Sequence, residues 1–195
     1  DLFKEQVISN PNKEAIICNN QRITFNDLDY MSDKFAAFLH DNYNLRVGDN
    51  ISIILDRSID LIIVILSVLK CGCSYVLIDS SHPLDRKKYM IDNSNSKYVI
   101  SNSVYDFENL IHIDSVFDMN LDKKYVCKKV TSDDNMYLLY TSGSTGNPKA
   151  VTITHKNFHN YLLGISREVE YSSDKTVLSI ASISFDVFGY ELWVT

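Results

Sequence analysis

The four cysteines of the sequence form no pattern typical of a metal site or a disulfide framework. Cys71 and Cys73 are one residue too close for the usual Cys-x-x-Cys spacing, and Cys18 and Cys127 do not form a second pair. Free cysteines are among the residues most often found in protein cores. We therefore expect buried thiols without a redox function, and no metal ligands in this chain.

The sequence also lacks a long hydrophobic run and a surplus of positive charge. The longest apolar stretch, 61–69, contains Ser67 and is far shorter than the about 20 residues that cross a bilayer. The 19 Lys and Arg residues are outnumbered by 25 Asp and Glu residues, whereas nucleic-acid binding favours a basic surface. No basic-then-apolar leader follows Asp1. We expect a cytoplasmic protein that binds neither nucleic acid nor membranes.

Short apolar runs alternate with amphipathic stretches along the chain. Strands are predicted at 15–18, 21–24, 51–55, 75–78, 97–101, 110–113, 137–140, 150–154 and 176–180, and helices at 25–39, 58–70, 83–93 and 155–167. The first two strands, joined by Asn19 and Asn20, predict a hairpin. The alternation that follows favours an α/β fold with a mostly parallel sheet and helices on both faces. The last residues, from Glu191, stop inside an apolar helical pattern without a stop signal, which predicts a truncated chain.

The segment 140–151 concentrates hydroxyl groups, two glycines and a lysine between two predicted strands. Gly143 and Gly146 allow backbone amides to turn toward an anion, and Lys149 supplies a positive charge. Further donors are the hydroxyls of Thr141, Ser142, Ser144 and Thr145. This donor set predicts a phosphate cradle, although the composition fits an ordinary turn-forming loop as well. Lys149 follows Gly146 by three positions with no Ser or Thr after it, which disfavours a conventional P-loop NTPase or dinucleotide fold.

Four segments resemble motifs of the adenylate-forming superfamily, which contains acyl-CoA synthetases, luciferases and the adenylation domains of nonribosomal peptide synthetases. Thr141-Ser-Gly-Ser-Thr-Gly-Asn-Pro-Lys149 resembles the superfamily's phosphate-loop signature. Leu69-Lys-Cys-Gly-Cys-Ser-Tyr-Val-Leu-Ile-Asp79 and Ile23-Thr-Phe-Asn-Asp-Leu28 are similar to the Leu-Lys-Ala-Gly-Gly-Ala-Tyr-Val-Pro-Ile-Asp and Leu-Thr-Tyr-x-Glu-Leu motifs of the peptide-synthetase domains. Phe185-Asp186 with Glu191 resembles the motif that opens their amino-acid pocket.

The resemblance covers essentially the whole chain. It implies that residues 1–195 form the N-terminal portion of an adenylation domain, namely the N-terminal part of its large subdomain, truncated at the C-terminal end. The chain departs from the family pattern where Cys73 and Ala150 replace glycine, Leu77 replaces proline and Phe188 replaces serine. None of these departures removes a charged or nucleophilic group.

The resemblance implies that an amino acid and ATP react to give an aminoacyl-adenylate and pyrophosphate. A peptidyl-carrier domain, with neighbouring synthetase domains, then receives the aminoacyl group on its phosphopantetheine thiol. ATP and Mg²⁺ are the implied cofactors. By match to the motifs, ATP contacts Thr141, Ser142, Gly143, Ser144, Thr145, Gly146 and Lys149, with Lys149 as the catalytic residue. Asp186 pairs with the α-ammonium of the substrate, and Phe185, Val187 and Tyr190 complete the substrate-binding set.

Several residues also have simpler interpretations. Asp186 fits a helix N-cap, and Val187 and Tyr190 fit ordinary core positions. His155 and His159 have the spacing of metal ligands on a helix but no third ligand, so we expect solvent or packing roles. The pair Lys87–Lys88 is predicted to be solvated surface.

Other functions remain open at this point. One is another adenylate-forming ligase, either a D-alanine–carrier ligase or an acyl-CoA synthetase, and another is a non-catalytic nucleotide-binding fragment. The family's adenine- and ribose-binding motifs lie beyond the motifs matched in this chain. We therefore expect the isolated chain to be inactive in adenylation.

Overall fold

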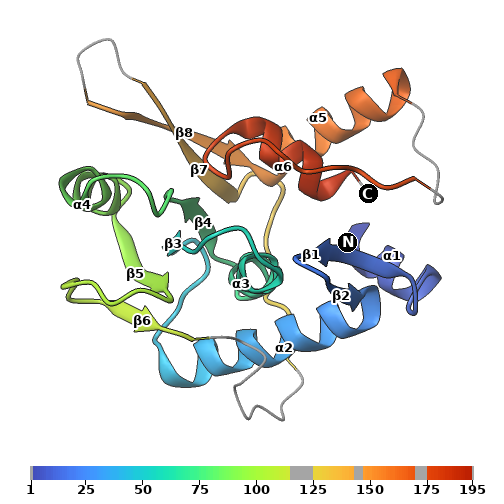
Figure 1. Cartoon of the computed structure of the whole chain (residues 1–195), viewed down its shortest axis with the longest axis horizontal. Coiled ribbons are helices and arrows are strands. Elements are labelled where there is room, and N and C mark those ends of the chain that lie inside the picture. Colours follow the sequence, from blue (N-terminus) through green and yellow to red (C-terminus); the bar gives the residue numbers. More distant parts are fainter. Residues whose placement is uncertain (1, 115–124, 143–146, 170–174, 195) are drawn as a thin grey trace.

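The computed structural model describes residues 2–114, 125–142, 147–169 and 175–194 (Figure 1). Its elements are, in chain order, α1 (Leu2–Ser9), β1 (Glu14–Cys18), β2 (Gln21–Thr24), α2 (Phe25–Asn42), β3 (Asn50–Ile54), α3 (Ile59–Lys70), β4 (Ser74–Leu77), α4 (Leu84–Asn93), β5 (Ser96–Ser101), β6 (Leu110–His112), β7 (Asn135–Thr141), β8 (Lys149–Thr154), α5 (His155–Glu168) and α6 (Asp186–Trp193).

The N-terminal part confirms the predicted hairpin. Strands β1 and β2 pair antiparallel, and the two residues between them, Asn19 and Asn20, have φ angles of 48° and 65°. Asparagine tolerates this left-handed conformation, which a tight hairpin turn requires. Thr24 then caps α2 by accepting a hydrogen bond from the Asp27 amide at 3.1 Å. Helix α1, which packs against α2, was not predicted.

A sheet of six strands, in the order β6-β5-β3-β4-β7-β8, organises the rest of the described chain. All of its pairs are parallel except β7 with β8, which are antiparallel. The mostly parallel α/β fold is therefore confirmed. Helix α3 is capped by Ser58, whose hydroxyl accepts from the Leu61 amide at 3.1 Å, and the turn after the helix has Gly72 at φ 75°.

The two faces of this sheet carry two separate hydrophobic cores, because successive strand residues point to opposite faces. Ile53 of β3 and Leu77 of β4 belong to the larger core, together with α2 and α3. Ile54 and Val76 point the other way, into a smaller core that includes Met90 of α4. In Figure 1 these helices accordingly lie on opposite sides of the sheet. Phe158 of α5 and Phe188 of α6 join the larger core, which brings α5 and α6 to the α3 side.

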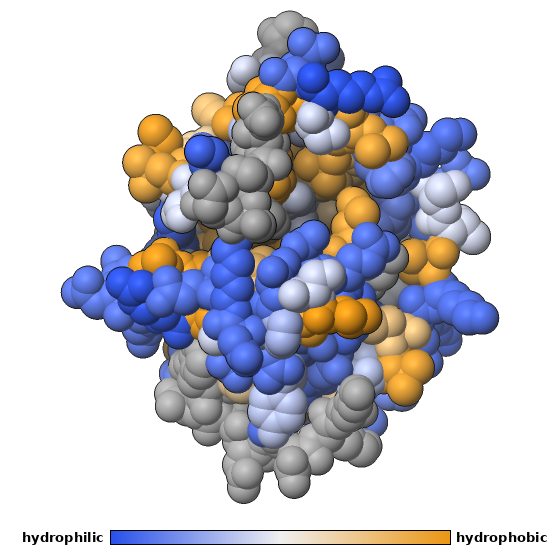
Figure 2. Space-filling view, turned by 90° about the vertical axis from the view of Figure 1, so that its right-hand side faces the viewer, coloured by the Kyte–Doolittle hydropathy of each residue, from blue (hydrophilic) through white to orange (hydrophobic). Residues whose placement is uncertain are grey.

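The surface mixes apolar and hydrophilic side chains. On the face that Figure 2 shows, the hydrophobic surface is broken into separate patches with hydrophilic residues between them. Leu178 and Ile180 expose 78% and 77% of their surface, so apolar side chains of the segment before α6 are open to solvent. Among the described residues, no helix has both the length and the apolar character that crossing a membrane requires.

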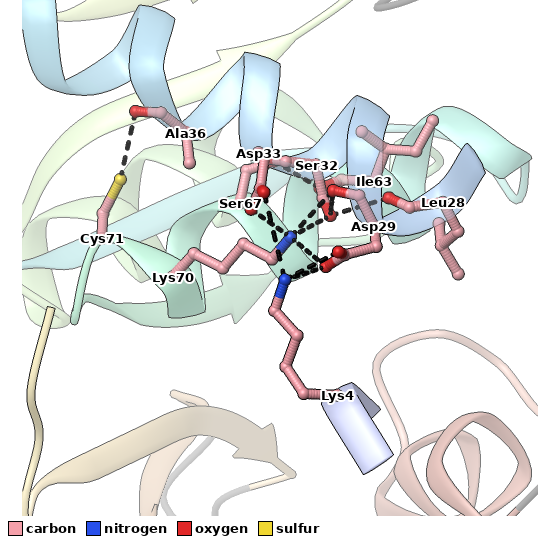
Figure 3. A network of polar contacts seen from close by, with 10 residues as sticks. All are labelled: Lys4, Leu28, Asp29, Ser32, Asp33, Ala36, Ile63, Ser67, Lys70 and Cys71. Atoms are coloured by element: carbon pink, nitrogen blue, oxygen red, sulfur yellow. Dashed lines mark hydrogen bonds and ion pairs between the residues drawn. The ribbon is translucent and has the colours of Figure 1, made fainter. Parts of the chain in front are cut away.

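A cluster of charged side chains joins α1, α2 and α3 (Figure 3). The ammonium group of Lys70 donates to Asp29 Oδ1 at 2.8 Å, to Asp33 Oδ1 at 2.6 Å and to the Ser32 hydroxyl at 2.7 Å. Lys4 adds a second ammonium group, 2.7 Å from Asp29 Oδ2. Every buried charge in this cluster thus has a partner of opposite sign, as burial in a low-dielectric interior requires.

Two predictions from the sequence are wrong. Residues 176–180 form no strand, because the carbonyls of Ser179 and Ala181 accept from the Arg57 side chain rather than from a neighbouring strand. Lys87 is buried rather than solvated, since its ammonium group donates to the Ser80 carbonyl at 2.6 Å and to the Tyr105 hydroxyl at 3.1 Å.

Candidate functional site

Polar side chains gather at the edge of the sheet where the parallel strands end. Strands β3, β4 and β7 run in the same direction, so their carboxyl ends lie at one edge. Asp56 and Arg57 follow β3, Asp79 follows β4, and the predicted phosphate loop follows β7. In open α/β sheets, ligands bind at this edge. The topology therefore places the candidate loop where a ligand site is expected.

The two ends of the loop are held together by the β7–β8 pair. Thr141 lies opposite Lys149 in the strand register, and its hydroxyl donates to the Lys149 carbonyl at 3.5 Å. On the far side, the Tyr89 hydroxyl donates to the carbonyl of the buried Pro148 at 3.2 Å. Thr141, Ser142 and Lys149 are exposed, so the Ser142 hydroxyl and the Lys149 ammonium group are available to an anion, and the Thr141 hydroxyl can donate to one by exchanging its long bond to the Lys149 carbonyl. The remaining predicted ligands, Gly143, Ser144, Thr145 and Gly146, lie outside the described residues.

Asp79 connects this edge to the segment that precedes α6. Its Oδ1 accepts from the Ser81 hydroxyl at 2.6 Å and from the Ser81 amide at 2.9 Å, and its Oδ2 accepts from the Ser182 hydroxyl at 3.5 Å. The hydrogen bonds from Ser81 are the main reason that the pKa of Asp79 lies below its ordinary value. At neutral pH an ionised carboxylate therefore accepts a hydrogen bond from the segment that leads into α6.

Asp186, the predicted partner of a substrate ammonium group, is the first residue of α6. Phe185 rather than Asp186 occupies the N-cap position, and the exposed Asp186 carboxylate accepts a local bond from the Val187 amide, at 2.9 Å. Val187 is 46% exposed and Phe185 63%, so neither is an ordinary core residue.

Asp186 and Phe185 line a small, shallow recess between α6 and strands β4 and β7. The other lining residues are Tyr75, Leu77, Tyr137, Leu139, Ile183, Phe188 and Gly189. The recess is thus mostly apolar, with one carboxylate and two phenols at its wall. Such a wall suits a ligand with one charged group and an apolar or aromatic body.

A chain of aromatic rings lies beneath this recess. Tyr75 stacks on Tyr137 at 5.3 Å, Tyr137 meets Phe158 edge-on at 5.7 Å, and Tyr161 meets Tyr190 edge-on at 6.4 Å between ring centroids. Burial, with the nearby charge of Asp186, raises the pKa of Tyr137 to about 12. The same two causes raise the pKa of Tyr161. Both phenols therefore stay protonated at physiological pH and can donate hydrogen bonds.

Arg57 was not singled out in the sequence, and Glu191 was identified only as part of the pocket motif. Arg57 reaches Ser179 and Ala181, and Glu191 accepts from the same two residues. The signal that could have found Arg57 is its position directly after a buried strand of a parallel sheet. Its partners lie more than 120 positions further along the chain, so spacing alone does not reveal them.

The histidines do not form a site in the described residues. Burial lowers the pKa of His155, against the opposing effect of Asp134, so the ring is neutral at physiological pH. His159 is exposed on α5. Within the ranges that the structure describes, no three potential metal-ligating side chains cluster together.

Comparison with known families decides the class of the protein. The family model described as "AMP-binding enzyme" matches residues 3–195. The chain belongs to the AMP-binding enzyme family. This family is the one that the phosphate-loop signature and the pocket motif indicated, so the resemblance seen in the sequence is confirmed.

The relatives that the chain matches include peptide synthetases. The chain is 36% identical over 193 residues to bacitracin synthase 1 of Bacillus licheniformis, covering 99% of this chain and 4% of that protein. It is 30% identical over 208 residues to gramicidin S synthase 1 of Brevibacillus brevis, covering 99% of this chain and 18% of that protein. The chain thus spans a small part of the relatives that it matches.

Solved structures of adenylation domains share the fold. The N-terminal subdomain of Klebsiella oxytoca NpsA, in complex with 3-hydroxyanthranilyl-AMSN, has a TM-score of 0.89 at 29% identity, covering 100% of this chain and 49% of that chain. An artificially fused adenylation–PCP di-domain, NpsA–ThdA, has a TM-score of 0.89 at 28% identity, covering 99% of this chain and 39% of that chain. The present chain therefore corresponds to about half of an adenylation N-terminal subdomain.

Proposed function

We propose that this chain is the N-terminal portion of an amino-acid adenylation domain of a nonribosomal peptide synthetase. The enzyme joins an amino acid to ATP and then loads a carrier-domain phosphopantetheine thiol. The observation that carries this proposal is the arrangement at one sheet edge. The Thr141–Lys149 hairpin leaves this edge, and Asp79 links it to the segment leading to Asp186.

The chemistry requires two negative groups to meet. One carboxylate oxygen of the amino acid attacks the α-phosphorus of ATP, a new P–O bond forms, and the bond to the bridging oxygen breaks to release pyrophosphate. Lys149 and the hydroxyls of Thr141 and Ser142 neutralise the departing phosphates, which stabilises charge as it develops on them. Bound Mg²⁺ supplies further neutralisation of the phosphates. Hydroxyl and ammonium donors fit a phosphate chain, and no ligand for the metal is assigned within this chain.

In this proposal, residues of α6 bind the amino acid. The Asp186 carboxylate pairs with the α-ammonium of the substrate, since such charge-assisted contacts are strong and directional. Val187 and Tyr190 lie on the same helix and contact the substrate side chain. The relatives named above are peptide synthetases, which supports an amino-acid substrate.

A second candidate substrate is an aryl carboxylic acid. The NpsA subdomain structures carry 3-hydroxyanthranilyl-AMSN and 3-hydroxybenzoyl-AMSN, which contain aryl acids. The recess beside α6 has two tyrosine rings on its wall, which suits a flat ring as well. Asp186 favours the amino acid, because a simple aryl acid has no α-ammonium group to pair with it.

The test is ATP–pyrophosphate exchange by the complete protein that contains this chain. Pooled amino acids and, separately, aryl, fatty and other simple carboxylic acids serve as substrates. Exchange that depends on one amino acid supports the proposal and names the substrate. Exchange only with carboxylic acids that lack an amino group identifies an acyl or aryl ligase and removes the role given to Asp186. Absence of exchange with every acid contradicts the adenylation function.

The chain alone is proposed to be inactive. It corresponds to about half of the solved N-terminal subdomains, so an ATP molecule held by its loop lacks the contacts that the rest of a subdomain supplies. Amino-acid-dependent exchange by the isolated 195-residue chain would contradict this part of the proposal.

A further inference from the structure

Two charged side chains hold the segment that leads into α6 from opposite sides. Arg57, directly after β3, donates from Nη1 to the Ser179 hydroxyl at 2.5 Å and to the Ser179 carbonyl at 3.2 Å, and from Nη2 to the Ala181 carbonyl. Glu191, on α6, accepts from the Ser179 hydroxyl at 2.7 Å and from the Ala181 amide at 3.2 Å. The Ser179 hydroxyl thus accepts from Arg57 and donates to Glu191.

Arg57 also contacts α6 itself. Its guanidinium carbon lies 5.2 Å from the ring centroid of Phe188, within the range of a cation–π interaction. Phe188 is 4% exposed, so the aromatic face that Arg57 contacts belongs to the buried side of α6. Arg57 therefore contacts both the segment that precedes α6 and the buried Phe188 ring on the helix itself.

The Glu191 carboxylate is kept in its ionised form. Partial burial acts to raise its pKa, but hydrogen bonds from Ser179 and from the amides of Ala181 and Ile180, together with the Arg57 charge, lower the pKa below its ordinary value. An ionised carboxylate has no proton to donate, so both of its oxygens can accept from the three donors, the Ser179 hydroxyl and the amides of Ala181 and Ile180.

We propose that Arg57 and Glu191 are positioning residues that fix the orientation of α6, and with it the Asp186 carboxylate and the Tyr190 ring that face the bound amino acid. This inference rests on the proposed function. Asp186, Tyr190 and Glu191 belong to one short helix, which moves as a unit. Release of the helix at Glu191 or Phe188 therefore displaces the groups that recognise the substrate, although Arg57 and Glu191 do not contact it.

The first test measures the helix in this chain directly. Trp193, the single tryptophan of the sequence, lies on α6 two residues after Glu191 and reports the environment of that helix. In Arg57→Ala and Glu191→Gln we expect a red shift of its emission and stronger quenching by acrylamide. Arg22→Ala removes an Arg–Glu pair on β1 and β2, at 2.7 Å from Glu14, and serves as the matched control with unchanged emission. Emission identical to wild type in both Arg57→Ala and Glu191→Gln overturns the proposal.

The second test measures substrate recognition in the complete enzyme. Loss of the charge-assisted bonds in Arg57→Ala raises the KM for the amino acid about tenfold or more, while the KM for ATP stays unchanged. Arg57→Lys keeps the charge without the two-pronged guanidinium and gives an intermediate KM. Arg22→Ala keeps both KM values.

The outcomes separate the two proposals. If the wild-type enzyme exchanges pyrophosphate with no amino acid, the proposed function fails, and the Trp193 measurement still decides whether Arg57 and Glu191 hold α6. If the wild-type enzyme is active but Arg57→Ala leaves the amino-acid KM unchanged, the positioning role fails alone. Equal increases in both KM values, accompanied by a loss of thermal stability, indicate a purely structural role and also overturn the inference.

Discussion

The ammonium group of Lys70 lies 2.6 Å from Asp33 Oδ1 across the α2–α3 interface, and both side chains are almost fully buried, at 6% and 5% exposure. Lys70 is also bonded to Asp29, so one lysine serves two carboxylates (Figure 3). Removal of one partner from a buried ion pair leaves an uncompensated charge, which costs far more than the net contribution of the pair.

Lys70→Met is therefore expected to lower the free energy of unfolding by about 3–5 kcal/mol, the range seen when a buried pair loses one member. Urea unfolding followed by circular dichroism measures the change. The control is Arg22→Ala, which removes an exposed ion pair, with 60% and 46% exposure, and is expected to cost less than about 1 kcal/mol. Equal losses of unfolding free energy in Lys70→Met and Arg22→Ala would show that the buried cluster stabilises the fold no more than an exposed ion pair does.

The same cluster predicts how stability depends on pH. Burial acts to raise the pKa of Asp29, but hydrogen bonds and charge from Lys4 and Lys70 bring it below the ordinary value of 3.8. A carboxyl whose pKa is lower in the folded state stabilises the fold at pH above its unfolded value, and this contribution is lost as the pH falls through the folded value. We expect Asp29→Asn to be less stable at pH 7 and to lose less stability than wild type below pH about 4. Urea midpoints of wild type and Asp29→Asn, measured between pH 7 and pH 2, give the dependence of stability on pH for each protein. An equal dependence in the two proteins would contradict the role given to Asp29.

The cysteines give a prediction about reactivity. Burial is the main cause that raises the pKa of Cys71 and of Cys73 to about 12, so both are protonated at physiological pH. Cys18 and Cys127 are only half-buried, and all four cysteines are free. Iodoacetamide at pH 8 is expected to alkylate Cys18 and Cys127 first, with Cys71 and Cys73 modified only after unfolding. Peptide mass spectrometry over time identifies the order, and early labelling of Cys71 or Cys73 would contradict it.

The loop gives a prediction about catalysis. Lys149→Ala in the complete enzyme is expected to lower turnover in pyrophosphate exchange about 100-fold, the usual cost of losing one donor to developing charge. The amino-acid KM stays close to wild type, since Lys149 serves the phosphates. Lys156→Ala, an exposed lysine on α5, is the control. Unchanged turnover in Lys149→Ala refutes the role given to this residue.

Local patterns predicted most of the fold. The hairpin at Asn19 and Asn20 and the cap at Thr24 depend on neighbouring residues only, and both are confirmed. The segment 176–180 has the alternation of a strand, but strands need partners, and its Ser179 carbonyl is bound by the Arg57 side chain, 122 positions away in the sequence. Lys87 has a charged head that a composition argument places in water, whereas the carbonyl of Ser80 and the ring of Tyr105 compensate its burial.

The candidate site, like the fold, could be predicted from the sequence only in part. Motifs predict roles for Lys149 and Asp186, because such chemical groups recur in fixed local patterns, and these roles stay predictions. The recess beside α6 was not visible in the sequence, because its wall joins Tyr75, Tyr137 and Gly189 from three distant elements. Arg57 was missed for the same reason. Each of these residues gains its environment from contacts that only the assembled sheet creates.

The strand order has a consequence for the growing polypeptide. Strands β3 to β6 are complete by residue 112, and they form one side of the sheet with β4 at its edge. Strand β7, which covers that edge through the pairing of Tyr75 with Tyr137, begins only at residue 135. Domains fold from the N-terminus during synthesis, and an uncovered apolar strand edge attracts other chains. While residues 113–134 are being added, the nascent chain therefore has the edge of β4 uncovered, and aggregation through this edge is favoured until β7 pairs with it.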